Sequence, residues 1–134
     1  MRRVYVFFYG LFMDVDLLGK KGIDARLRPA SLGGFRLRIG DRATLIPSEG
    51  DTVYGMVAAL THRDIDQLYS DPSLREYRPE AVQVDTDTGE TIPALCFNLT
   101  EAPQRQERNP EYANKLRDLA GRLGFPSEYV SRIK

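Results

Sequence analysis

The sequence predicts an α+β domain in which strands outnumber helices. Short runs of β-branched or alternating apolar residues predict the strands, and segments with apolar residues at every third or fourth position predict the helices. The chain has 134 residues, which fits one domain because domains usually contain ~100–150 residues. It shows no internal repeat and no linker-like segment, so we expect residues 1–134 to form a single domain.

Two strands are predicted in the first third of the chain. Residues 4–9 are β-branched or aromatic and are followed by Gly10, which predicts a buried strand that enters a tight turn. In residues 30–39, apolar side chains alternate with Arg36 and Arg38. This spacing predicts a strand with one face in the core and the other in water.

The sequence also predicts two hairpins. Residues 43–47 and 52–60 have strand patterns and flank the turn-forming cluster Ser-Glu-Gly-Asp. Residues 81–84 and 92–99 likewise flank Asp-Thr-Gly-Glu. We therefore expect each pair of strands to be antiparallel neighbours.

Capping residues mark two of the helices. Thr61 and Asp64 form a weak capping box, which predicts a helix over residues 62–69. Asn109 followed by Pro110 predicts a second helix, which apolar spacing extends until a glycine at position 124. Shorter helical segments are predicted at 14–22 and 129–133, and exposed connections at 23–29 and 101–109.

Charge and hydropathy exclude several classes of protein. Nineteen basic and 19 acidic side chains cancel to a formal net charge of zero, so no overall positive field attracts nucleic acid or anionic lipid. No apolar run approaches the ~20 residues that span a bilayer. The single Cys96 cannot form an internal disulfide, which favours a cytoplasmic protein. We therefore expect neither a nucleic-acid nor a membrane partner.

The side chains needed for metal or nucleotide chemistry are scarce. His62 is the only histidine and Cys96 the only cysteine, which disfavours a Cys/His catalytic pair and a histidine-rich metal site. The sequence contains no GxSxG, GxGxxG or P-loop motif. We expect no metal and no cofactor.

The end of the first strand is one candidate site. Tyr9 is followed by Gly10, and turns of this kind can aim successive backbone amides at an anionic or carbonyl oxygen. By itself, a strand followed by glycine is more often an ordinary turn.

A second candidate site lies in the loop that follows the predicted helix at 62–69. Asp71 and Glu76 lie close in sequence to Tyr69 and Tyr77, and carboxylates beside tyrosines are suited to proton transfer in a partly dry pocket. The alternative is structural: Asp71 precedes a proline and can end a helix, and Glu76 can pair with an arginine.

Several segments, taken in order, resemble the gamma-glutamylcyclotransferase-like family. The loop Tyr9-Gly10-Leu11-Phe12-Met13 is similar to that family's Tyr-Gly-Ser/Thr-Leu/Asn-Leu/Met loop, and the tail Gly124-Phe-Pro-Ser-Glu-Tyr129 to its Gly-Leu-Pro-x-x-Tyr tail. Residues 30–37, 52–57 and 60–66 match the family's two intervening strands and its helix start. The likeness covers nearly the whole chain.

This resemblance implies a small mixed β-barrel with flanking helices and a cavity bordered by the first loop. In active members, backbone amides of that loop hold the substrate and a glutamate in Leu-Asp-x-x-Glu-Gly relays a proton. The gamma-glutamyl amine attacks its own side-chain carbonyl, so that 5-oxoproline forms and an amine leaves. No cofactor is implied.

The position of that glutamate departs from the pattern. Read forward from Ile65 and Asp66, the glutamate position falls on Tyr69; read back from Tyr77, it falls on Asp71. A tyrosine is only ~0.1% ionised at pH 7 and is a poor base. Asp71 could serve if burial raised its pKa.

Two hypotheses follow. The leading one is cyclisation of a gamma-glutamyl amine, with Asp71 or, second, Glu76 moving the proton and the Gly10–Phe12 backbone stabilising the oxyanion. The alternative is a non-catalytic small-ligand-binding or interaction domain, because the usual glutamate is replaced. Either way we expect a small-molecule amide or amino-acid-like ligand, and a homodimer stays open. The predicted substrate-binding residues are Tyr9, Gly10, Leu11, Phe12, Tyr69 and Tyr77.

Overall fold

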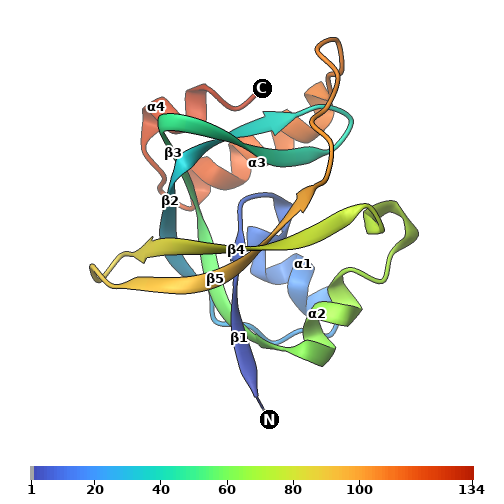
Figure 1. The fold of residues 1–134 in the computed structure, drawn as a ribbon, viewed down its shortest axis with the longest axis vertical. Coiled ribbons are helices and arrows are strands. Elements are labelled where there is room, and N and C mark those ends of the chain that lie inside the picture. The colour runs from blue at the N-terminus through green and yellow to red at the C-terminus, as the bar shows by residue number, and fades with distance from the viewer. Residues whose placement is uncertain (1) are drawn as a thin grey trace.

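Five strands close into a mixed barrel in the computed structural model, which describes residues 2–134 (Figure 1). Around the barrel the strands follow the order β1-β3-β2-β4-β5. Four of the pairings are antiparallel, and β5 closes the barrel against β1 in parallel, with Val6 opposite Leu95. The strands are β1 (Arg3–Phe8), β2 (Arg28–Ile39), β3 (Ala43–Thr61), β4 (Tyr77–Thr86) and β5 (Thr91–Leu99). The expected α+β fold with a small mixed barrel is confirmed.

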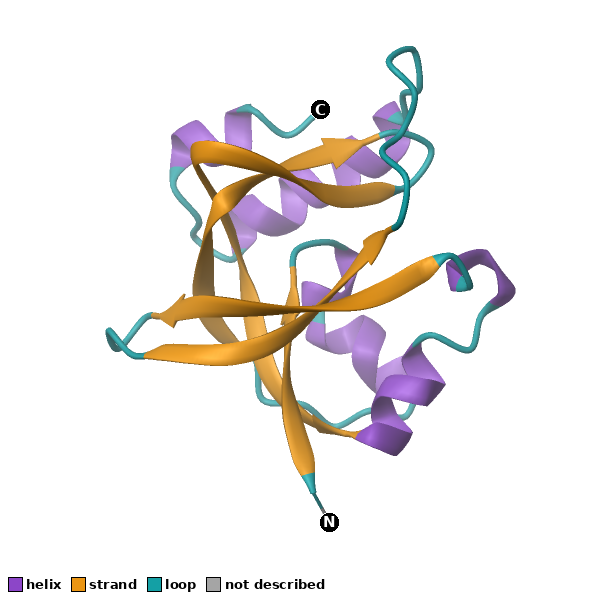
Figure 2. Cartoon of the chain, in the orientation of Figure 1, coloured by secondary structure: helices purple, strands orange, loops and turns teal. Residues whose placement is uncertain are grey.

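The helices lie outside the barrel in two groups, α1 with α2 and α3 with α4 (Figure 2). They are α1 (Val15–Lys20), α2 (His62–Leu68), α3 (Pro110–Arg122) and α4 (Ser127–Ser131), with 3-10 turns η1 (Leu11–Met13) and η2 (Pro72–Leu74). The predicted capping box forms, because Thr61 and Asp64 exchange side-chain and backbone hydrogen bonds at the start of α2. Asn109 caps α3 with a single hydrogen bond, in which its side chain accepts from the amide of Tyr112.

The first predicted hairpin is wrong. Residues 43–61 form one strand, β3, and both of its halves pair with β2 rather than with each other. The register shifts between Gly33 and Phe35, so residues 48–51 are accommodated as an irregularity within the long ladder. Gly50 has φ 85° there, a conformation that suits glycine and that is also typical of a turn. The second hairpin, between β4 and β5, is confirmed.

The core fills the barrel and extends under α3. Phe7, Val53 and Leu60 are buried inside the sheet, and Leu116 of α3 is fully buried against it. No helix between residues 2 and 134 is both long enough and apolar enough to cross a membrane. The last three residues of β1 are buried in this core and paired with β3, which fixes the point where the first loop begins.

Candidate functional site

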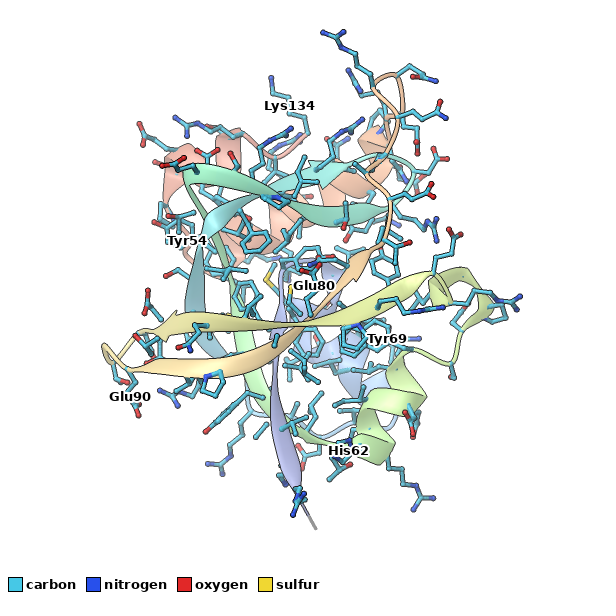
Figure 3. All side chains as sticks on the ribbon, in the orientation of Figure 1. Tyr54, His62, Tyr69, Glu80, Glu90 and Lys134 are labelled. Carbon is cyan, nitrogen blue, oxygen red and sulfur yellow. The ribbon has the colours of Figure 1, made fainter. Side chains whose placement is uncertain are left out.

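A cavity of about 310 Å³ opens where β1 ends. The first loop, the end of α2, the start of β4 and one residue of α3 border it. Tyr69, labelled in Figure 3, extends from the end of α2 toward the barrel. The aromatic residues that line the cavity are Phe7, Phe8, Tyr9, Phe12, Tyr69, Tyr77, Phe97 and Tyr112.

Close contacts of Tyr9 and Gly10 fix the start of the first loop. The Tyr9 hydroxyl is buried and donates to the Phe97 carbonyl at 2.7 Å. Gly10 is extended, with φ −117°, a conformation open to any residue, so the 3-10 turn η1 makes the bend that we expected of the glycine. Glycine is required there for a different reason: a Cβ on Gly10 would lie 2.5 Å from the Tyr112 hydroxyl.

The backbone groups of this loop, which borders the cavity, differ in whether they have hydrogen-bond partners. The carbonyls of Gly10 and Leu11 accept from Met13 and Asp14, each at 3.0 Å. Within residues 2–134, the amides of Gly10 and Phe12 have no protein acceptor. Two donors of residues that line the cavity are therefore without a protein acceptor, and a turn that binds an anionic or carbonyl oxygen needs such donors.

We expect Gly10→Ala to lower the free energy of unfolding by about 1–3 kcal/mol, because the new methyl group overlaps the Tyr112 hydroxyl. In a Tyr112→Phe background, the nearest remaining atom is the ring carbon at 3.8 Å, so the same change should then cost little. Denaturant unfolding of the two single variants and the double variant measures this coupling. Equal costs of Gly10→Ala in both backgrounds would show that the contact does not constrain the loop.

Four tyrosines of the site remain neutral at physiological pH. Burial raises the pKa of Tyr9 and of Tyr69 well above the usual value, and it raises the pKa of Tyr77 and of Tyr112 to about 12. Tyr69 stacks on Phe97, with ring centroids 4.0 Å apart. A neutral, stacked phenol can form hydrogen bonds with a ligand, but it cannot act as a general base.

Of the two carboxylates that we predicted as proton carriers, only Asp71 borders the cavity. Asp71 borders the cavity but is exposed, and its carboxylate accepts from the amide and hydroxyl of Ser73 at 2.9 and 2.8 Å. These hydrogen bonds lower the pKa of Asp71, so the rise in pKa that a buried base needs is not found. Glu76 is outside the cavity wall and pairs with Arg42 at 3.1 Å.

Sequence reasoning missed several residues of the wall. Lys21 comes from the end of α1, Asp41 and Arg42 precede β3, and Phe97 comes from β5. Closure of the barrel brings Asp41, Arg42 and Phe97 beside the first loop, and the packing of α1 brings Lys21 there. Among the described residues, no group of three or more His, Cys, Asp or Glu side chains could hold a metal ion.

The small mixed barrel has the fold of a solved gamma-glutamyl cyclotransferase. The family model "Gamma-glutamyl cyclotransferase, AIG2-like" matches residues 6–116. The chain therefore belongs to this family.

Solved structures share the whole fold. A protein described as gamma-glutamyl cyclotransferase superposes with a TM-score of 0.82 at 21% identity, over 99% of this chain and 89% of the other. An uncharacterized human protein gives 0.80 at 21% identity, over 100% and 89% of the two chains. YkqA from Bacillus subtilis gives 0.79 at 22% identity, over 98% of this chain and 53% of YkqA. No curated protein sequence matches significantly.

Proposed function

We propose that the protein binds a small amide or amino-acid-like ligand in the cavity at the first loop, without cyclising it. The observation that carries this proposal is the state of Tyr69. This residue falls on the position of the family's glutamate when the sequence is read forward from Ile65 and Asp66. Its ring is stacked on Phe97 and its pKa is raised by burial. The site thus keeps the donors and walls of a binding pocket, while this position supplies no base.

The surroundings of the remaining carboxylates support the same proposal. Asp41 and Asp71 are the acids of the cavity wall, and both are exposed. A general base works best with a pKa near the working pH, whereas the hydrogen bonds from Ser73 lower the pKa of Asp71. Asp71 is instead occupied with capping η2.

Cyclisation through Asp71 is the second candidate function. Its support is that Asp71 borders the same cavity as Gly10 and Phe12. In that case the carboxylate would leave Ser73 and turn inward, and the Gly10 and Phe12 amides would bind the carbonyl oxygen of a gamma-glutamyl amide.

Calorimetry with gamma-glutamyl amides, combined with an assay for 5-oxoproline, separates the two candidates. We expect binding without product. Product that Asp71→Asn abolishes would overturn the binding proposal in favour of cyclisation. Asp66→Asn is the matched control, because Asp66 is an exposed carboxylate of α2 outside the cavity wall. Absence of both binding and product would contradict both candidates and favour an interaction domain.

A further inference from the structure

The inner wall of the cavity is suited to an aromatic group. Phe12 stands edge-on to Phe8 and to Tyr69, with ring centroids 6.0 and 5.8 Å apart. Leu11, Leu17 and other aliphatic side chains complete this wall. Aromatic rings favour such edge-to-face contacts and gain more from them than buried area alone provides.

The size of the cavity limits what fits there. An apolar protein cavity of ~150 Å³ holds one benzene molecule. At about 310 Å³, this cavity has room for one ring and a polar portion of similar size. A compound as small as a single acylated amino acid satisfies this limit.

One cation beside the aromatic wall, Lys21, forms no salt bridge within residues 2–134, although its charge helps to lower the pKa of Asp71. The ammonium group of half-buried Lys21 lies 5.9 Å from the centre of the Phe12 ring, and among residues 2–134 no carboxylate lies within 4 Å of it. The other cation of the wall, Arg42, is already paired with Glu76. The Lys21 carbonyl accepts a hydrogen bond from Gln67, which ties the end of α1 to α2.

We propose that the ligand is an aromatic amino acid acylated on its amine. This inference rests on the proposed binding function and names its ligand class. The aromatic ring packs on Phe8 and Phe12, the acyl carbonyl accepts from the free amides of the first loop, and the carboxylate pairs with Lys21. Each of the three groups meets the part of the cavity that complements it.

Calorimetric titration with three probes tests the assignments of the ring and of the carboxylate. N-acetyl-L-phenylalanine should bind about ten-fold or more tightly than N-acetyl-L-alanine, because burial of the ring supplies the difference. It should also bind up to about five-fold more tightly than N-acetyl-L-phenylalanine amide, which lacks the carboxylate. Lys21→Met should remove the second difference and leave the first.

Lys20→Met is the matched control, because Lys20 is the neighbouring lysine of α1 and lies outside this cavity wall. It should leave all three affinities unchanged. Equal affinity for the phenylalanine and alanine probes, or a carboxylate preference that survives Lys21→Met, would overturn the inference. If gamma-glutamyl amides bind and none of the three probes does, the inference fails and the proposed function stands. If no compound of either set binds to the folded protein, the proposed function fails as well.

Discussion

Gly55→Ala is expected to destabilise the barrel by about 3 kcal/mol or more, at the upper end of the range for overpacked cores. A Cβ on Gly55 would lie 2.2 Å from the Phe8 carbonyl oxygen and 2.7 Å from the Phe7 ring. The first of these atoms belongs to the backbone of β1, so no side-chain rotation relieves the overlap. Strand β1 would have to move away from β3, to which it is paired along its whole length.

Gly33→Ala is the matched control for this change. Gly33 also lies in a strand of the barrel, but a Cβ there meets nothing within 4 Å and its φ is not positive. The free energy of unfolding of the Gly33→Ala variant should stay unchanged or rise by up to about 1 kcal/mol, because alanine reduces the entropy of the unfolded chain. Guanidinium unfolding of both variants measures the difference, and equal stabilities would contradict the close approach of β1 to β3.

The same packing explains which parts of the fold were predictable from the sequence. Residues 4–9 and 92–99 could be predicted as strands from the apolar pattern of their own side chains. Helices α2 and α3 could be predicted from their capping residues. The continuity of β3 was not, because it depends on β2 pairing with both halves of the strand. No property local to residues 48–51 distinguishes a bulge in a long ladder from a hairpin turn.

The residues of the candidate site also fall into those that the sequence predicted and those that it did not. Tyr9 and Gly10 could be identified from a strand that ends in glycine. Lys21 and Phe97 could not, because the docking of α1 brings Lys21 to the cavity and barrel closure brings Phe97 there from β5. The two registers for the missing glutamate correspond to two places in space: Tyr69 stacks within the aromatic wall, and Asp71 lies exposed beside it.

Tyr69→Glu is therefore expected to produce cyclisation of gamma-glutamyl amides, about 100-fold or more faster than Tyr69→Gln, since a positioned general base typically contributes 10²–10⁴-fold. The carboxylate would enter a wall that raises the pKa of the tyrosine it replaces through burial. The same burial would raise the pKa of the new glutamate toward neutrality, which suits a base. It would take a proton as the amine attacks the side-chain carbonyl and return it to the departing amine, so 5-oxoproline and a free amine are the products.

Tyr69→Gln separates this chemistry from packing, because glutamine has nearly the shape of glutamate and cannot carry the proton. Both variants lose the stacking on Phe97, so their unfolding free energies should fall together. Release of 5-oxoproline is measured over a range of pH, and activity in Tyr69→Glu should rise with pH as the glutamate ionises. If both folded variants bind gamma-glutamyl amides and neither forms product, position 69 is not where this cavity needs a base. The proton carrier, if the chain has one, would then have to be sought at Asp71.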